Sequence, residues 1–323
     1  MPPPEFWRHR GLAAIALSPL GALVSHLGPL WRARTTPTVV GVPVICVGNL
    51  TVGGAGKTPL VIALARALQG LGRAPHILSR GYGGRLKGPL RVDPVQHEAQ
   101  DVGDEPLLLA RMAPTWICAD RATSARAAVE DGADILLMDD GFQNPGLIKT
   151  VSILVIDGGY GFGNGQVMPA GPLREALAGG LARADAAVII GDDITGIRDA
   201  IADRCPIFDA RIVPIPDQGI TGKPVIAFAG IGRPEKFYAS LQELGCTLIE
   251  TRNFADHHPY TPDEIMRLCD LAHALDATLV TTEKDLVRLP DAARKMVQAL
   301  RIAVEWSDPA TPGHLLRKAL GNG

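Results

Sequence analysis

The feature that most constrains the fold of this chain is a glycine-rich turn between an apolar run and a helix. The run PVICVG (43–48) ends in glycine and is typical of a buried parallel strand. The stretch PLVIALARALQGLG (59–72) is typical of a helix closed by glycines. NLTVGGAGKTP joins the two. This order predicts a phosphate-binding loop (P-loop), in which backbone N–H groups and the helix N-terminus face phosphate oxygens.

The residue types of this turn predict how it holds a nucleotide. Lys57 is expected to reach the β- and γ-phosphates, and the hydroxyl of Thr58 is expected to ligate Mg²⁺. Thr51 stands where the usual pattern has a glycine, but other glycines lie close to it on both sides. The residues expected to contact the nucleotide are Thr51, Val52, Gly53, Gly54, Ala55, Gly56, Lys57 and Thr58.

A second strand-like run, DILLMDDGFQ (134–143), ends in two aspartates. Open α/β sheets bind ligands at the carboxyl ends of their strands, so Asp139 and Asp140 are candidates to hold Mg²⁺ beside the P-loop. Adjacent residues cannot both face inward from a regular strand, and we expect one to bend away at Gly141. The sequence leaves open which aspartate is nearer the metal, and a solvated strand end is the alternative interpretation.

The N-terminal segment 11–31 is apolar and lies between pairs of arginines. Pro19 and Pro29 interrupt it, which argues against a secretory signal and weakens the case for a spanning helix. We interpret it as an amphipathic helix in the membrane interface, with the arginines facing anionic lipids. An ordinary core helix is the alternative, because periodicity does not distinguish the two. The apolar face comprises Leu12, Ile15, Leu20, Leu23, Leu27 and Leu30, and the arginines are Arg8, Arg10, Arg32 and Arg34.

Strand-like and helical runs alternate along the chain, which predicts an α/β fold of the P-loop NTPase type with a mainly parallel sheet. A second set of alternating elements begins after VPIPDQG (213–219) and predicts a smaller α/β lobe. The expected division is an N-terminal membrane-associated helix (1–34), a P-loop domain (35–215) and a smaller C-terminal lobe (216–323).

Charge and composition exclude several classes of protein. With 32 Lys and Arg against 34 Asp and Glu, the net charge is −2, so no general basic field attracts nucleic acid. Aromatic residues make up only 5% of the chain, which argues against a base-stacking surface. We therefore expect no nucleic-acid partner. The five cysteines are widely spaced and show no metal-binding pattern, as expected of a protein that stays in the cytosol.

Eight motifs occur in a fixed order: VGNLTVGGAGKTP, SRGYGG, VGDEP, ADR, DDGFQ, PAGPLRE, FADHHPYT and TTEKDLVRLP. Counted from the apolar run that leads into the first motif, they span residues 43–290 and resemble the tetraacyldisaccharide 4'-kinase family of lipid A biosynthesis. The resemblance implies phosphorylation of the 4'-hydroxyl of a lipid A disaccharide 1-phosphate, with ATP and Mg²⁺, at the cytosolic face of a Gram-negative inner membrane. Such an acceptor also accounts for the apolar N-terminus, because moving acyl chains into water costs about 0.8 kcal/mol per CH₂.

The resemblance implies roles for four more residues. Asp104, in VGDEP, matches the residue that takes the proton of the acceptor hydroxyl, and His257, in FADHHPYT, matches its partner. A helix N-cap is the alternative role for Asp104. Arg121 is expected to meet phosphate, or else to lie on a solvated helix start. Glu175 is expected to order the nucleotide or metal region, or else to favour the dipole of a helix from its first turn.

A P-loop also occurs in proteins with other functions. The guanine-reading motif N-K-x-D is absent from the sequence, and TTEKD (281–285) has Glu where Asn is needed. We interpret Glu283 and Lys284 as an exposed, salt-bridged helix start in preference to a nucleotide contact. Two alternatives to the lipid kinase remain open: a membrane-associated nucleotide switch, and a soluble small-molecule kinase with residues 11–31 packed in its core.

Overall fold

The computed structural model describes residues 4–321, which form two β-sheets. The strands of the larger sheet are β1 (Val44–Gly48), β2 (Pro75–Ser79), β3 (Leu90–Arg91), β4 (Thr115–Ile117), β5 (Ile135–Asp139), β6 (Val151–Asp157), β7 (Ala186–Ile190), β8 (Ile207–Pro214) and β13 (Ile302–Trp306). Their order in space is β13-β8-β7-β6-β1-β5-β2-β4-β3. Neighbouring strands are parallel, except for the antiparallel pairs β13–β8 and β3–β4 at the two edges.

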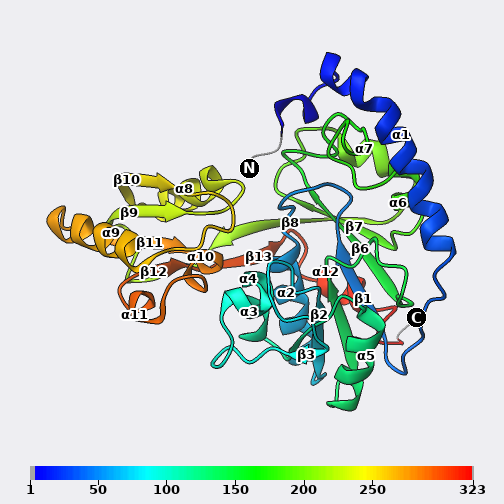
Figure 1. Cartoon of the computed structure of the whole chain (residues 1–323), viewed down its shortest axis with the longest axis horizontal. Helices are drawn as coiled ribbons and strands as arrows, with labels where there is room; N and C mark the ends of the chain where they lie inside the picture. Colours follow the sequence, from blue (N-terminus) through cyan, green and yellow to red (C-terminus); the bar gives the residue numbers. More distant parts are fainter. Residues whose placement is uncertain (1–3, 322–323) are drawn as a thin grey trace.

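The central strands are buried on both faces, as their continuous apolar runs predict. Helix α2 packs on one face together with α12, and α5, α6 and α7 pack on the other. The predicted α/β fold with a mainly parallel sheet is therefore confirmed (Figure 1). The helices of this lobe are α2 (Lys57–Gly70), α3 (Ala99–Val102), α4 (Asp104–Ala110), α5 (Arg121–Glu130), α6 (Leu177–Leu181), α7 (Ile197–Ile201) and α12 (Thr311–Leu316).

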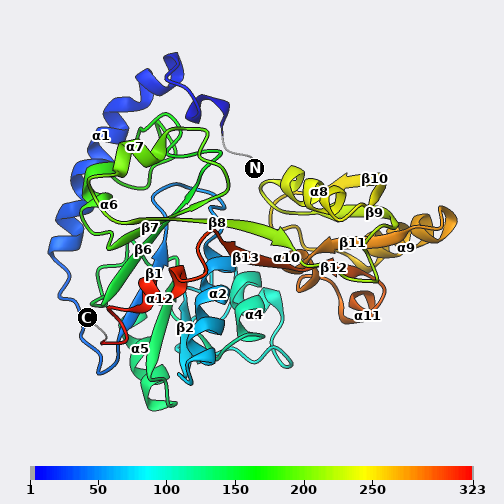
Figure 2. The ribbon, with the colours of Figure 1, turned by 180° about the vertical axis from the view of Figure 1, so that it is seen from behind.

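The smaller lobe contains a parallel four-stranded sheet in the order β10-β9-β11-β12. Its strands are β9 (Pro224–Ala229), β10 (Thr247–Asn253), β11 (Thr278–Thr282) and β12 (Gln298–Leu300). Its helices are α8 (Pro234–Glu243), α9 (Pro262–Ala274), α10 (Glu283–Leu286) and α11 (Asp291–Arg294). Figures 1 and 2 show this lobe beside the larger one, with β8 and β13 running between them.

The end of the chain departs from the predicted division at residue 216. After β12 the chain returns to the larger lobe, where β13 pairs with β8 and α12 packs on the large sheet. The expectation that 216–323 forms one lobe is therefore wrong for the last elements. Leu315 and Leu316 explain the return, because their burial completes the apolar cover on the side of the sheet that α2 occupies.

The N-terminus forms a short 3₁₀ helix, η1 (Glu5–Trp7), and a long helix, α1 (Leu12–Ala33). Small residues face the larger lobe: Ala14 is buried, and a Cβ on Gly21 would come within 2.5 Å of the carbonyl oxygen of Val167. The large apolar side chains point outward and are exposed, namely Leu12, Ile15, Leu20, Leu23, Val24, Leu27 and Leu30. A core helix would show the opposite arrangement, so the alternative that 11–31 packs into a core is wrong. By length and composition α1 could cross a membrane.

Candidate active site

The P-loop lies between β1 and α2, at the carboxyl edge of the large sheet. Gly53 and Gly56 have φ values of +110° and +88°, which only glycine adopts without strain. Gly48 must also be glycine, because a Cβ there would lie 2.5 Å from the Cβ of Phe142. The N–H of Val52 donates to the carbonyl of Pro172, which ties the loop to the segment that carries PAGPLRE. These constraints explain the glycine-rich sequence of the turn.

Lys57 begins α2, and its Nζ lies 3.7 Å from Oδ1 of Asp140. Asp140 has a φ of +49° and leaves the line of β5, as predicted for one of the two aspartates. Its carboxylate accepts two hydrogen bonds from Nη1 of Arg174, at 2.9 and 3.0 Å. Burial acts to raise the pKa of Asp140, but the charges of Lys57 and Arg174 outweigh it and lower that pKa. Asp140 is therefore a fixed anion that orients the P-loop lysine.

Asp139 is the last residue of β5 and is only 2% exposed. Its Oδ1 is buried without a hydrogen-bond partner. Burial, and next the negative charges of Glu105 and Asp140, raise the pKa of Asp139. A buried carboxylate oxygen without a hydrogen-bond partner fits a cation, whose charge would compensate the negative charge of the carboxylate. Between them, Asp139 and the hydroxyl of Thr58, at the start of α2, offer oxygen ligands of the kind that Mg²⁺ prefers.

The described residues, 4–321, contain no cluster of three or more His, Cys, Asp or Glu side chains that could hold a metal by themselves. Mg²⁺ in phosphotransferases is usually held by one or two carboxylates together with substrate phosphates and water. The donor set here fits that arrangement.

Arg121 lies at the start of α5 and is buried, although the sequence left a solvated position open. Its Nη1 donates to the carbonyl of Cys118 at 2.5 Å, and its Nε has no hydrogen-bond partner. Burial lowers the pKa of Arg121, and the neighbouring charges of Asp139 and Asp140 act against this effect. A buried guanidinium with a free donor, beside Asp139 and Asp140, is well suited to bind an anionic phosphate group.

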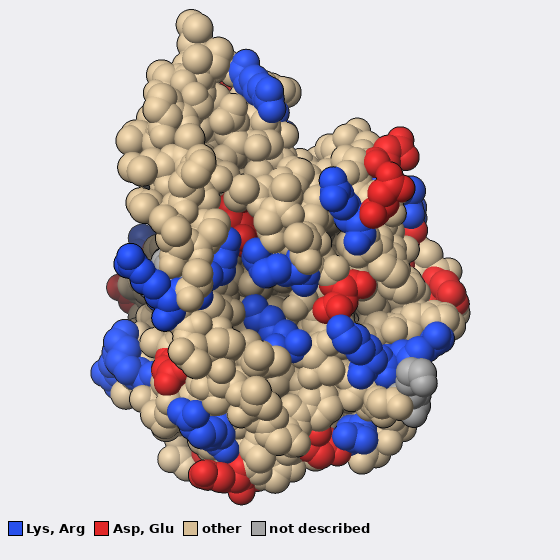
Figure 3. Space-filling view, turned by 90° about the vertical axis from the view of Figure 1, so that its right-hand side faces the viewer, with Lys and Arg blue, Asp and Glu red and all other residues tan. Residues whose placement is uncertain are grey.

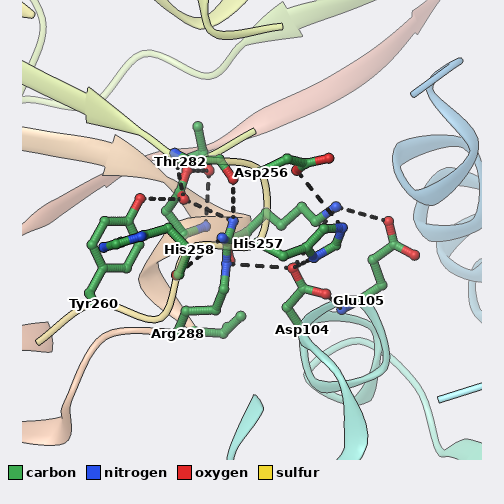
Figure 4. Close-up of polar contacts among 12 residues, drawn as sticks. Asp104, Glu105, Asp256, His257, His258, Tyr260, Thr282 and Arg288 are labelled. Carbon is green, nitrogen blue, oxygen red and sulfur yellow. Dashed lines mark hydrogen bonds and ion pairs between the residues drawn. The ribbon is translucent and has the colours of Figure 1, made fainter. Parts of the chain in front are cut away.

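Asp104 is brought together with His257 across the two lobes, although 153 positions separate them in the sequence. Figure 4 shows the pair: Nδ1 of His257 lies 2.9 Å from Oδ2 of Asp104. Asp104 is the first residue of α4, and Gly103 occupies the N-cap position that was the alternative role for Asp104. His257 has a φ of +60°, a strained conformation for a residue with a side chain. Its N–H donates to the carbonyl of Gly230, which holds the loop in that conformation.

Two cations of the small lobe also face Asp104, and the sequence predicted neither of these contacts. Nε of Arg288 lies 3.5 Å and Nζ of Lys284 lies 3.9 Å from Oδ2 of Asp104. Lys284 also pairs with Glu105 at 3.1 Å, so it is salt-bridged as expected, but between the lobes. The expected exposure of this helix start is wrong, because Glu283 and Lys284 are both half-buried, and Glu283 accepts a hydrogen bond from the N–H of Ile302. Burial acts to raise the pKa of Asp104, but the hydrogen bond from His257 and the nearby cations outweigh it and lower that pKa.

Glu175 is buried, and its neighbours differ from those expected of a nucleotide ligand. Arg183 and Arg32 pair with its two carboxylate oxygens at 2.6 and 3.0 Å. Gln143 bridges from Glu175 to the carbonyl of Asn49, just before the P-loop. Glu175 therefore connects the end of α1 to the segment that precedes the loop, and its predicted role toward the nucleotide or metal stays a prediction.

A P-loop with its acidic partners on one side, and a buried carboxylate oriented by a histidine on the other, is the arrangement of a P-loop kinase, which passes a phosphoryl group from a nucleotide to a second substrate. Comparison with known proteins narrows the class. The family model described as tetraacyldisaccharide-1-P 4'-kinase matches residues 13–321, and the chain belongs to this family.

Curated relatives and a solved structure agree with this assignment. The tetraacyldisaccharide 4'-kinase of Rhodospirillum centenum is 51% identical over 99% of this chain and 97% of the relative. The enzyme of the same name from Gluconacetobacter diazotrophicus is 50% identical over 97% of this chain and 96% of the relative. The crystal structure of LpxK from Aquifex aeolicus in complex with ATP superposes with a TM-score of 0.76 at 28% identity, and the match covers 95% of this chain and 99% of that one.

Proposed function

We propose that this protein transfers the γ-phosphoryl group of ATP to the 4'-hydroxyl of a tetraacyldisaccharide 1-phosphate, a step of lipid A biosynthesis. Membership of the tetraacyldisaccharide-1-P 4'-kinase family supports the proposal. The observation that carries it for this chain is the hydrogen bond between Asp104 and His257. The negative charge of Glu105, the next residue, acts to raise the pKa of Asp139, which supports a position of Asp104 on the side of the carboxyl end of β5.

Each side chain then has a distinct task in the transfer. The P-loop amides and Lys57 hold the triphosphate, and Arg121 supplies a further positive charge to the phosphates. Asp139 and Thr58 would hold Mg²⁺, which neutralises charge on the transferred phosphoryl group when bound. The oxygen of the 4'-hydroxyl forms the new bond to phosphorus, the bond to the leaving ADP oxygen breaks, and Asp104 accepts the hydroxyl proton. His257 orients the carboxylate through its Nδ1–H.

We propose further that the protein works at the cytoplasmic face of the inner membrane, with α1 in contact with anionic lipids. The outward leucines of α1 support this, as do Arg8, Arg10 and Arg34, which are exposed near its two ends. Figure 3 shows the face that carries α1: its upper part is mostly free of charged residues, and below it Lys and Arg lie among Asp and Glu. An apolar surface rimmed by basic residues suits the boundary between acyl chains and anionic headgroups.

Phosphate transfer to a defined lipid tests the proposal. The purified protein is incubated with ATP, Mg²⁺ and tetraacyldisaccharide 1-phosphate in detergent, and the lipid is analysed by mass spectrometry with mapping of the modified position. We expect the mass of one phosphate to appear at the 4'-position, and ATP turnover to require the lipid. If the folded protein leaves the lipid unmodified, the proposed function is wrong. ATP hydrolysis at the same rate without lipid would favour the nucleotide switch.

A further inference from the structure

Arg288 lies just after α10 in the small lobe, and every edge of its guanidinium is engaged. Nη2 donates to the carbonyl of Gly230 at 3.0 Å and pairs with Asp285 at 2.8 Å. Nη1 donates to the carbonyl of His258 at 3.4 Å. Nε donates to the carbonyl of Lys284 at 3.2 Å and also lies 3.5 Å from Oδ2 of Asp104 (Figure 4). With only 5% of its side chain exposed, Arg288 has one orientation open to it.

Asp285 is fully buried and fixes Arg288 from behind. Its carboxylate accepts hydrogen bonds from the hydroxyl of Tyr260 at 2.7 Å, the hydroxyl of Thr282 at 2.6 Å and the N–H of Gly230 at 2.9 Å. A buried carboxylate with this many donors is held rigidly in place. The ring of Tyr260 also lies beside the guanidinium of Arg288, 5.9 Å from it. The small lobe thus contains a pre-organised support for a single arginine.

We propose that Arg288 is a positioning residue for Asp104, and that Asp285 acts through Arg288 by holding it in place. This inference rests on the proposed function, because it assumes that Asp104 accepts the proton of the acceptor hydroxyl. Arg288 approaches Oδ2 of Asp104, the same oxygen that His257 binds. Its guanidinium therefore holds a positive charge beside that oxygen, which favours one position of the carboxylate and compensates its negative charge before the proton is accepted.

The charged groups around Asp104 come from three segments. His257 lies in the loop after β10, together with Asp256, whose carboxylate is 3.8 Å from Nε2 of His257. Lys284 lies in α10, and Glu105 follows Asp104 in α4 and pairs with Lys284. Removal of the Arg288 charge leaves the hydrogen bond of His257 and the charge of Lys284 at this carboxylate, so the pKa of Asp104 rises. The acidic limb of the kcat/KM profile against pH then moves to higher pH.

Kinetics of three single variants, made in the full chain, test the proposal. Arg288→Met removes both the positive charge and the N–H donors of the guanidinium, whereas Arg288→Lys keeps the positive charge. The control is Arg294→Met in the same lobe, where Arg294 pairs with Asp291 at 2.6 Å and donates to the carbonyl of Val287. In the control the acidic limb should stay in place, because no contact joins Arg294 to Asp104.

We expect Arg288→Met to lower kcat by roughly 10- to 100-fold, as a displaced base does, with the KM for ATP changed little. Its acidic limb should lie at higher pH than that of the wild type, and Arg288→Lys should restore most of the limb position. A role confined to stabilising the lobe would lower the melting temperature in both arginine variants and leave the limb unmoved. That result, or an equal shift in Arg294→Met, overturns the proposal.

Two further variants keep the test decisive. If Arg288→Met does not fold, Asp285→Asn replaces it in the test, because Asn preserves the volume of the side chain but removes the charge that holds Arg288. If folded Asp285→Asn leaves the acidic limb of the kcat/KM profile in place, the proposal is again overturned. Asp104→Asn separates this inference from the proposed function. Suppose that the wild type transfers phosphate, that Asp104→Asn does not, and that the Arg288 variants behave like the wild type. In that case only the inference about Arg288 fails. If wild type transfers no phosphate to the lipid, the proposed function fails and the inference fails with it.

Discussion

The outward face of α1 provides a prediction that separates membrane attachment from folding. Leu20, Leu23 and Leu27 are 53%, 54% and 53% exposed, so the protein itself buries only about half of each side chain. Full burial of a leucine contributes about 1.5–3 kcal/mol, and the exposed halves therefore offer roughly 1 kcal/mol each to a membrane. The triple variant Leu20→Gln/Leu23→Gln/Leu27→Gln should lose about 3 kcal/mol of membrane affinity, or roughly 100-fold in the partition coefficient.

The assay is co-sedimentation with vesicles that contain phosphatidylglycerol, combined with thermal unfolding. The matched control carries Leu71→Gln, Val95→Gln and Ile194→Gln, three changes at exposed apolar positions outside α1. Both triple variants should melt near the wild-type temperature, because substitutions at exposed sites usually change stability by less than about 0.5 kcal/mol each. Only the α1 variant should leave the vesicles. The reasoning is refuted if the α1 variant sediments like the control, or if it unfolds at a much lower temperature.

Three other substitutions test the P-loop and the base. Lys57→Ala should lower the rate of phosphate transfer by roughly 100-fold or more. The protein should stay folded, because Arg174 still holds Asp140. Transfer at the wild-type rate would contradict the role of Lys57. Gly48→Ala should lower the free energy of unfolding, measured in urea, by about 1–3 kcal/mol, because the new Cβ meets Phe142. The control Gly70→Ala has open space around its Cβ and should not lower it. Equal stabilities of the two variants would show that the contact with Phe142 relaxes freely. Asp104→Asn should melt below the wild type at pH 7 and approach it in acid. The lowered pKa of Asp104 means that its carboxylate stabilises the folded state above its ordinary pKa, and that this contribution is lost as the pH falls through the folded-state pKa. A variant as stable as the wild type at pH 7 would speak against a net favourable ion cluster.

The local parts of the site were predictable from the sequence, because short-range patterns determine them. Strand, glycines, Gly-Lys-Thr and helix follow one another without a break. Asp139 ends a strand that pairs directly with β1, and Asp140 follows it. The amphipathic helix at the N-terminus was also predictable, but periodicity did not say which of its faces is buried. The spacing of Ala14 and Gly21 gives the missing signal, since a stripe of small residues lets a helix lie close to its neighbour.

Contacts between distant segments could not be predicted in this way. Arg288 meets Asp104 only after two lobes have folded and packed together, and no local pattern in TTEKDLVRLP indicates its partner. The pairing of Arg32 with Glu175 has the same origin. One signal was available: Lys284 and Arg288 are four residues apart, the spacing at which side chains of a helical segment point the same way. That spacing indicates a shared target, although it does not say which one.

A second contact between the lobes shows that the cluster at Asp104 is part of a wider pattern. Asp157, buried at the carboxyl end of β6, pairs with Arg233 at 2.5 Å and Lys236 at 2.7 Å, both from the small lobe. At both places the larger lobe contributes a buried carboxylate and the smaller lobe contributes the cations. Separating a buried carboxylate from its partner costs about 3–5 kcal/mol unless water replaces the partner. The charge and orientation of Asp104 therefore depend on how the small lobe packs against the larger one. A substitution that disturbs the contacts of Asp157 should also change the pKa and the position of the Asp104 carboxylate.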